Sequence, residues 1–388
     1  MQKIIIEAQE YMSHSNVDGW LLYDYRQSNP FFRSVLGSTN MVTRPAFLFI
    51  PATGDAVLLI HDVDLGRFSS INHRKMKYTS RASLLDILRQ VLKNVHRVAM
   101  EYSPMGELPR VSQVDAGTLE MVRSIEVEVV SSANLVQYVT QRWNSSQLKS
   151  HKMTANLLST IVMEAFQYMK RNLDSSPSEL EIVDFILQRF NEEELETPDG
   201  PIVAVDQHSS DPHYLPTENT SVPIKHGSWV LIDMWAREKN ADGIFADITW
   251  VGYVGNVIPR HYQEIFDIVV NARDIALDFL EKAYRTMKPP QGWQVDKIAR
   301  DYISSKGYGH YFTHRLGHSL GTEVHGDAVN LDGWETHDTR LVIPQIGITI
   351  EPGIYMPEFG MRSEIDVYIS DSGPLVTSAI QKKIVLVA

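Results

Sequence analysis

The stretch HRLGHSLGTEVH, from His314 to His325, decides the fold expected of this sequence. Three of its residues, His314, His318 and His325, are histidines, and most of the others are small or apolar. Glycines beside the histidines disfavour a helix, which leaves extended, closely packed backbone as the expected conformation. Histidines in such a segment are either satisfied within a core or act as ligands, and acidic residues elsewhere in the chain decide between the two.

Four acidic residues stand in or beside apolar runs with strand patterning. SWVLIDMW places Asp233 at the end of one strand, GIFADITWVGYV places Asp247 inside the next, and the intervening REKNADG has the composition of a turn. IGITIEPGIY places Glu351 where a strand meets Pro-Gly, and MRSEIDVYIS places Glu364 at the start of a further strand. Two hairpin-like units are therefore expected to bring four carboxylates among apolar neighbours.

Burying these carboxylates is costly unless each one finds a cation or takes up a proton. One acid at a strand end would be unremarkable, but four around a histidine-rich segment indicate a site. Arg362 is the one basic residue within these strands, and one arginine cannot neutralise four acids. Two divalent cations can, and an oxygen-rich set with one imidazole suits manganese, cobalt or iron, with zinc also possible. Two ions about 3.5–4 Å apart can hold a bridging hydroxide for hydrolysis.

Composition limits the remaining classes of function. The chain has 388 residues, is 43% hydrophobic, carries a formal net charge of −12 and has no cysteine. This length fits two domains. The acidic balance excludes nucleic acid as an expected partner, because phosphate binding needs a basic patch. No apolar run approaches the ~20 residues of a membrane span, and the N-terminus is too acidic for a signal peptide. Without cysteine, disulfides and thiolate sites are excluded, and a cytoplasmic location is expected.

The pattern of the chain changes near residue 143. Before it, short apolar runs alternate with helical periodicity, with a strand expected at 18–25, a hairpin at 46–61 and a helix at 83–95. This alternation is typical of an α/β domain, and we place that domain at residues 1–143.

Residues 144–388 mix long helical patterns with the acidic strands and form the second predicted domain, of α+β type. One long helix follows the boundary, and two more are expected at about 260–287 and 293–306. The helix in SPSELEIVDF is predicted to begin with Ser176 as its cap, Pro177 at its first position and Glu179 completing a capping box.

At the acidic and histidine-rich motifs the sequence resembles the pita-bread metallopeptidases, which include aminopeptidase P, prolidase and methionine aminopeptidase. LIDMW, FADIT, HRLGHSLGTEVH, TIEPGIY and GMRSE occur in the order of that family, and RPAFLFIP and HDTR resemble its aminopeptidase P and prolidase branch. The resemblance implies an α/β creatinase-like N-terminal domain and an α+β pita-bread catalytic domain. The N-terminal domain disfavours methionine aminopeptidase.

The resemblance also implies the role of each matching residue. Asp233 would bind one metal, Asp247 and Glu364 would bridge two, and His318 would be the single histidine ligand. Glu351 would be a ligand that also handles the proton of the attacking water. His213, His314 and His325 would face the substrate, and Arg362 would hold a ligand carboxylate from behind. Gly317 and Gly321 would allow the backbone to approach the site closely.

The implied activity is hydrolysis of the bond between an N-terminal residue and proline, through a hydroxide that bridges two divalent ions. Manganese is the favoured ion, with cobalt, zinc or iron as alternatives, and a homodimer is the expected assembly. The expected partner is a peptide with proline in its second position. Two alternatives are a binding protein of this fold without catalysis and a creatinase-type hydrolase, and the complete ligand set argues against both. The sequence leaves open whether dipeptides or longer peptides are cleaved.

Three departures from the family pattern accompany these matches. His213 lies slightly further before Asp233 than is usual in the family. The turn between Asp233 and Asp247 is longer than in most relatives, which should not move the strands. Trp250 stands where many relatives have arginine, which leaves any contact made by that arginine in doubt. Trp229, Trp235 and Trp250 are interpreted as packing residues.

Overall fold

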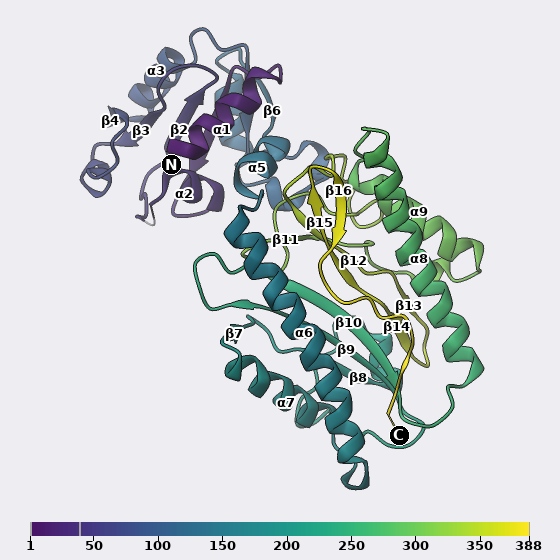
Figure 1. The fold of residues 1–388 in the computed structure, drawn as a ribbon. Coiled ribbons are helices and arrows are strands. Elements are labelled where there is room, and N and C mark those ends of the chain that lie inside the picture. The colour runs from purple at the N-terminus through teal and green to yellow at the C-terminus, as the bar shows by residue number, and fades with distance from the viewer. Residues whose placement is uncertain (1, 39, 388) are drawn as a thin grey trace. The chain divides into compact units, whose positions relative to one another are not determined.

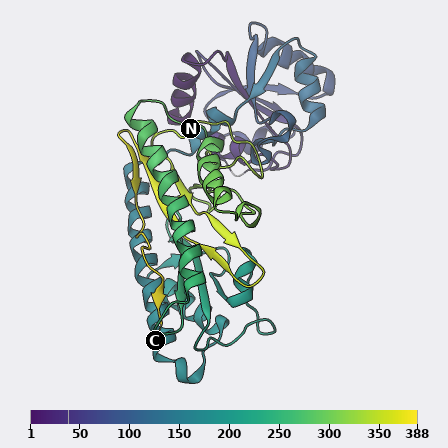
Figure 2. The same ribbon diagram turned by 90° about the vertical axis from the view of Figure 1, so that its right-hand side faces the viewer.

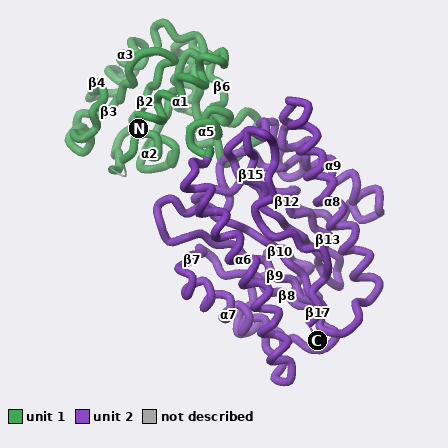
Figure 3. The backbone as a smooth tube through the Cα atoms, viewed as in Figure 1, with its two compact units in different colours: residues 1–142 green, residues 143–388 purple. Residues whose placement is uncertain are grey.

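The structure is a computed structural model that describes residues 2–38 and 40–387. The chain separates into two compact units, residues 1–142 and residues 143–388, shown in different colours in Figure 3. Each unit has its own hydrophobic cores and is described separately below.

Unit 1 is built on one mixed six-stranded sheet in the order β4-β3-β2-β1-β5-β6. Its central strand β1 runs antiparallel to β2 and parallel to β5. The strands are β1 (Gly19–Asp24), β2 (Ala46–Pro51), β3 (Val57–His61), β4 (Arg74–Tyr78), β5 (Arg97–Met100) and β6 (Glu128–Ser131).

Helices cover both faces of this sheet. Alternate residues of β1 enter opposite cores, so that Leu22 packs with residues of α1, α2 and α5, while Leu21 packs with residues of α3 and α4. The α/β pattern, the hairpin at 46–61 and the helix near 83–95 are confirmed. The helices are α1 (Gln2–Ser13), α2 (Pro30–Leu36), α3 (Arg81–Val91), α4 (Ala116–Arg123) and α5 (Ala133–Thr140), with 3-10 turns η1 (Leu65–Phe68), η2 (Pro104–Gly106) and η3 (Pro109–Val111).

The described residues of unit 2 form three sheets. Strands β9 and β10 form the predicted hairpin and belong to a five-stranded sheet, while β12 and β15 are paired in a four-stranded sheet and β13 and β14 form a two-stranded ribbon. The strands are β7 (Leu195–Glu196), β8 (Ile202–Val205), β9 (Trp229–Glu238), β10 (Ala246–Tyr253), β11 (Ser319–Leu320), β12 (Gly347–Ile350), β13 (Gly353–Tyr355), β14 (Gly360–Arg362), β15 (Ile365–Ser370), β16 (Gly373–Val376) and β17 (Val385–Leu386).

Long helices enclose the sheets of unit 2, with α6 and α7 on one side and α8 and α9 on the other (Figures 1 and 2). Val230 and Ile232 of β9 pack toward α6 and α7, while Leu231 packs toward α8 and α9. No helix in the described ranges has both the length and the apolarity needed to cross a bilayer. The helices are α6 (Ser145–Arg171), α7 (Glu179–Glu192), α8 (Arg260–Arg285) and α9 (Gly292–Ser305), with 3-10 turns η4 (Leu173–Ser175), η5 (Asp206–Ser210) and η6 (Gly309–Tyr311).

The predicted start of α7 is wrong by two residues. Ser178, not Ser176, accepts the hydrogen bond from the backbone of Glu181, whose carboxylate in turn accepts from the Ser178 N–H. The sequence contains two overlapping Ser-x-x-Glu motifs, Ser176 with Glu179 and Ser178 with Glu181, and the second caps the helix. Glu179 is unavailable for the first because its buried carboxylate accepts from the backbone N–H groups of Val205 and Val222.

Candidate metal centre

The hairpin of β9 and β10 presents two buried carboxylates on one face. Asp233 pairs with Thr249 in the antiparallel ladder, and Asp247 pairs with Trp235. Because side chains alternate along a strand, Asp233 and Trp235 share a face with Asp247 and Thr249. The long 239–245 turn leaves this register intact, as expected. A carboxylate of Asp366 on β15 accepts from the backbone N–H of Asp247 at 3.1 Å and so fixes that strand from behind.

The second pair of acids comes from the segments that follow β12 and β14. Glu351 follows β12, and its carboxylate accepts from the Thr349 hydroxyl at 3.2 Å. Glu364 lies between β14 and β15, and its carboxylate accepts from the Thr249 hydroxyl at 2.8 Å. Thr249 is also placed to donate to Asp233 at 3.1 Å, but one hydroxyl proton serves only one of these acids at a time.

His318 reaches the acids because Gly317 precedes it. A Cβ atom at Gly317 would lie 2.1 Å from the Thr349 carbonyl oxygen, so only glycine allows this approach to β12. Short strand β11 begins just after His318, and no helix forms here, as the glycines predict. The His318 Nδ1 atom lies 3.1 Å from the Ser319 carbonyl oxygen, which assigns the proton of a neutral ring to Nδ1.

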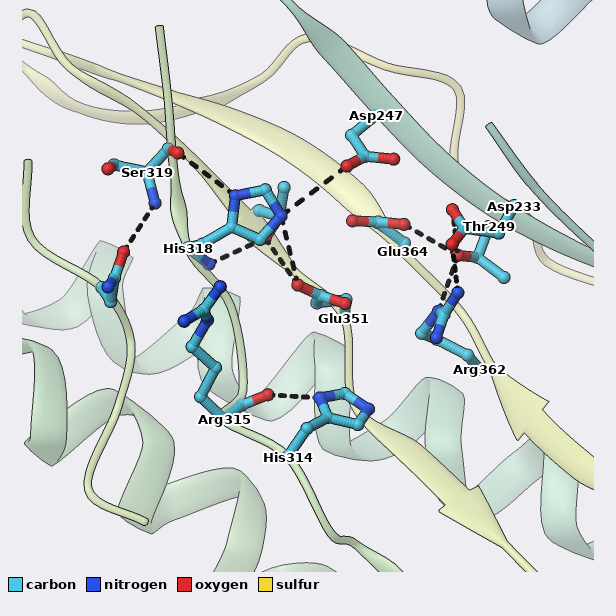
Figure 4. Close-up of polar contacts among 12 residues, drawn as sticks. Asp233, Asp247, Thr249, His314, Arg315, His318, Ser319, Glu351, Arg362 and Glu364 are labelled. Carbon is cyan, nitrogen blue, oxygen red and sulfur yellow. Dashed lines mark hydrogen bonds and ion pairs between the residues drawn. The ribbon is translucent and has the colours of Figure 1, made fainter. Parts of the chain in front are cut away.

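The other ring nitrogen of His318 faces only acceptors. Its Nε2 atom lies 3.4 Å from Glu351 Oε1 and 3.6 Å from Asp247 Oδ2 (Figure 4). These contacts would be ion pairs if His318 were protonated, but burial lowers its pKa well below the usual value, and neighbouring His325 and Arg315 lower it further. A lone pair that faces two carboxylates would be satisfied by a cation bound between them.

Unpartnered atoms point to the same conclusion. Asp247 Oδ1 and Glu364 Oε1 are buried and have no hydrogen-bond partner. One ligand atom from each of Asp247, His318 and Glu364 lies within 4.8 Å of the others. Burial raises the pKa of both acids well above the usual value, and the surrounding carboxylates raise it further. The donor set of oxygens and one imidazole therefore fits divalent metal ions.

Arg362 supports the remaining acid. Its guanidinium donates to the Asp233 carboxylate, to the Thr249 hydroxyl at 2.8 Å and to the Tyr355 hydroxyl at 2.9 Å. Burial raises the pKa of Asp233, and the charge of Arg362 opposes that rise. The Tyr355 hydroxyl continues the network to His314 Nε2 at 2.8 Å.

All of the predicted site residues line one cavity of about 360 Å³. His318 and His325 have ring centroids 4.4 Å apart, and His213 approaches Asp233 closely enough for its charge to lower the Asp233 pKa. Nδ1 of His314 contacts the Arg315 carbonyl oxygen at 2.6 Å, so both of its ring nitrogens are bound within the protein. The lining residues are Asp199, Ile202, Pro212, His213, Asp233, Trp235, Asp247, His314, Arg315, His318, Val324, His325, Glu335, Glu351, Arg362 and Glu364.

Sequence reasoning missed seven residues of this lining, among them Trp235, Arg315 and Glu335. Trp235, interpreted as a packing residue, does line the cavity, and its position two residues after Asp233 could have shown this through the strand alternation. Trp250 points away from the acids and packs against the core beneath α6, while Trp229 is buried in the other core. Arg315 and Glu335 also line the cavity, and no strand pattern marks either of them.

Comparison with known proteins gives the family. A model of metallopeptidase family M24 matches residues 154–371, more than half of the chain. The chain is 32% identical over 186 residues to the uncharacterized peptidase YqhT of Bacillus subtilis, covering 48% of each protein. It is 30% identical over 234 residues to an uncharacterized peptidase of Staphylococcus haemolyticus, covering 59% of this chain and 60% of that one. These matches span about half to three fifths of the curated relatives.

Solved structures resemble the chain over its whole length. Dipeptidase PepE from Mycobacterium ulcerans has a TM-score of 0.73 at 18% identity and covers 100% of this chain and 97% of its own. The Xaa-Pro dipeptidase from Bacillus anthracis has a TM-score of 0.65 at 20% identity, with 99% of both chains covered. These likenesses confirm the predicted fold class, an α/β N-terminal part followed by an α+β pita-bread part. With the family model matched across the acids and histidines of the site, the chain belongs to metallopeptidase family M24.

Proposed function

We propose that this chain is a metal-dependent exopeptidase that hydrolyses the bond between an N-terminal residue and proline. The observation that carries the proposal is the pair of unpartnered oxygens on Asp247 and Glu364, which lie with a ring nitrogen of His318 on the wall of one cavity. Solved structures of similar fold are named Xaa-Pro dipeptidase and prolidase, which supports the proline specificity.

Five residues would hold two divalent ions. Asp247 and Glu364 would contribute to holding both ions, because each is buried among the other carboxylates and has one oxygen without a partner. Asp233 would bind one ion, and His318 and Glu351 the other. Manganese as the ion, a homodimer as the assembly and a cytoplasmic location stay predictions of the family resemblance.

The chemistry that bound ions supply at such a site is a nucleophile made from water at neutral pH and stabilisation of charge on the attacked carbonyl. Glu351 is suited to accept and return a proton, because burial raises its pKa to about 7 while Arg362 and Arg315 hold it from rising further. His213 and His325 line the cavity and would donate to the carbonyl oxygen. Asp233 lies where the free amine of the substrate would bind.

His314 receives a different role from the one expected. Its two ring nitrogens are occupied by the Tyr355 hydroxyl and the Arg315 carbonyl, so it has no proton left to offer a substrate. Burial lowers its pKa to about 3, which keeps the ring neutral at the pH of the cell. We therefore assign His314 as a positioning residue that holds Tyr355 and, through it, Arg362.

The experiment is hydrolysis of Ala-Pro, Ala-Pro-Ala and Ala-Ala by metal-stripped protein with and without added Mn²⁺. The proposal expects cleavage of a proline substrate that depends on the metal, and little cleavage of Ala-Ala. Cleavage of Ala-Ala as fast as the proline substrates would overturn the specificity. No cleavage of any substrate by protein that binds two ions would overturn the enzyme assignment.

A further inference from the structure

The cavity contains a second guanidinium besides that of Arg362. Among the described residues that line the cavity, Arg315 and Arg362 are the arginines, and none is a lysine. Arg362 is fully engaged by Asp233, Thr249 and Tyr355 behind the acids. The side chain of Arg315 is 23% exposed, and it forms a long ion pair of 3.9 Å with Glu335.

The backbone holds Arg315 firmly while its side chain remains loosely paired. The Arg315 N–H donates to Glu335 Oε1 at 2.9 Å. Glu335 is itself fixed, because the buried carboxylate of Asp332 accepts from the N–H groups of Trp334 and Glu335, both at 2.9 Å. The next residue along, Leu316, accepts from the backbone N–H of Glu351 at 2.8 Å, which joins this segment to the metal ligands.

The charges along the cavity suit a small zwitterion. Figure 4 shows the Glu351 carboxylate between the Arg315 side chain on one side and the Asp233–Arg362 pair on the other. Arg315 and Glu351 both line this cavity. A substrate with its amine at Asp233 and its scissile carbonyl beside Glu351 would therefore extend toward Arg315.

The cavity is also small. Its volume of about 360 Å³ lies at the low end of the ~300–1,000 Å³ typical of ligand sites. Trp235, Val324 and Ile202 form an apolar part of its wall. A short substrate that ends at the proline fits these limits better than a longer chain.

We propose that Arg315 receives the free α-carboxylate of the substrate, which makes the enzyme a dipeptidase. This inference rests on the proposed function, because it assumes that the substrate has proline as its second residue. Arginine suits the role, since its planar fork binds a carboxylate through two parallel hydrogen bonds. Glu335 would continue to accept from the backbone N–H of Arg315. The carboxylate of the substrate would replace the carboxylate of Glu335 as the partner of the Arg315 guanidinium.

The test compares Ala-Pro with Ala-Pro-NH2, which lacks only the negative charge. The metal-loaded wild-type enzyme is expected to cleave Ala-Pro with a kcat/KM about 10- to 100-fold higher, mainly through KM, as the loss of a hydrogen bond to a charged group predicts. In Arg315→Met this difference should disappear, so that the two substrates have equal kcat/KM. Arg315→Lys should retain part of it, because lysine keeps the charge without the fork.

A matched control and a binding readout separate this role from a structural one. Arg260→Met removes the charge of an arginine that is 91% exposed on α8 and should leave the Ala-Pro preference as in the wild type. Inhibition by L-proline should exceed inhibition by prolinamide in the wild type and equal it in Arg315→Met. If Arg315→Met slows Ala-Pro and Ala-Pro-NH2 by the same factor, Arg315 acts on Glu351 or on folding, and the inference is wrong.

Failure of this inference differs from failure of the proposed function. If the wild-type enzyme cleaves Ala-Pro-Ala or Ala-Pro-NH2 with the same kcat/KM as Ala-Pro, the carboxylate site is overturned and the proline specificity is retained. If no proline substrate is cleaved, the proposed function fails, and binding of Ala-Pro and Ala-Pro-NH2 by calorimetry decides the carboxylate site. Tighter, Arg315-dependent binding of Ala-Pro would support it, and equal binding would overturn it.

Discussion

At the scale of single residues, the two oxygens of Asp247 have different surroundings. Oδ2 lies 3.6 Å from His318 Nε2, and Oδ1 is buried without a partner. Asp247→Asn would offer one oxygen and one N–H group in place of two oxygens and would remove a negative charge. We expect this variant to lose its tightly bound divalent ions. Its kcat/KM should fall at least about 100-fold, because substitution of residues that merely hydrogen-bond to metal ligands already lowers activity by about 10- to 100-fold.

Metal content after dialysis, measured by mass spectrometry, and Ala-Pro hydrolysis check this prediction together. Asp184→Asn is the matched control, because Asp184 is an exposed acid on α7 that does not line the cavity. An Asp247→Asn protein with normal turnover and two bound ions would contradict the assignment.

The sequence was sufficient to predict that the acids and His318 lie together, because the free-energy cost of burying a carboxylate can be recognised from the apolar residues around it in the sequence. A carboxylate inside an apolar run needs a partner wherever the strand is placed. The place of Arg315 and Glu335 in the cavity wall was not predictable in this way. It depends on the conformation of a loop that is fixed by hydrogen bonds from the N–H groups of Trp334 and Glu335 to Asp332. The occupied ring of His314 was likewise hidden, since Tyr355 lies 41 positions away in the sequence.

At the scale of elements, the start of α7 provides a quantitative test. Ser178→Ala removes the side-chain acceptor for the N–H of Glu181 and should lower the free energy of unfolding by about 1 kcal/mol. Ser176→Ala should cost less than half of that, because the side chain of Ser176 does not cap the helix. Urea unfolding of the two variants beside the wild type measures both values. A larger loss for Ser176→Ala would restore the cap predicted from the sequence.

Element types were more predictable than element boundaries. Apolar periodicity over β9, β10, α6 and α8 extends for many residues and outweighs local detail. The beginning of α7 depended instead on two overlapping Ser-x-x-Glu capping motifs. The motif that contains Glu179 does not cap the helix, because the Glu179 carboxylate accepts hydrogen bonds from the N–H groups of Val205 and Val222, which lie outside the helix.

At the scale of the whole molecule, unit 1 contains a buried acid unrelated to the metal centre. Glu101 is fully buried and accepts from Trp20, Asn29 and Ser132. Burial raises its pKa to about 7, above that of the unfolded chain, and the hydrogen bonds oppose this rise. The folded state therefore holds the proton more tightly, and unit 1 should lose about 3 kcal/mol of stability as pH rises from about 4.5 through 7.

Glu101→Gln should remove this dependence on pH, because the amide does not titrate. The two full-length proteins are compared by the urea concentration at which unit 1 unfolds, at pH 5 and at pH 8. Unfolding is detected by pulse proteolysis, as cleavage within residues 1–142. A Glu101→Gln protein whose midpoint changes between these pH values as much as that of the wild type would contradict the prediction.

The order of the ligands along the chain has a consequence for biosynthesis. Asp233 and Asp247 leave the ribosome first, and Glu364 leaves last, on the order of ten seconds later at ordinary rates of translation. Until then the hairpin of β9 and β10 meets cellular ions with an incomplete set of ligands. The proposed ions would therefore be acquired once most of unit 2 has been synthesised, and the cell's free-ion concentrations at that moment would determine which metal the newborn protein captures.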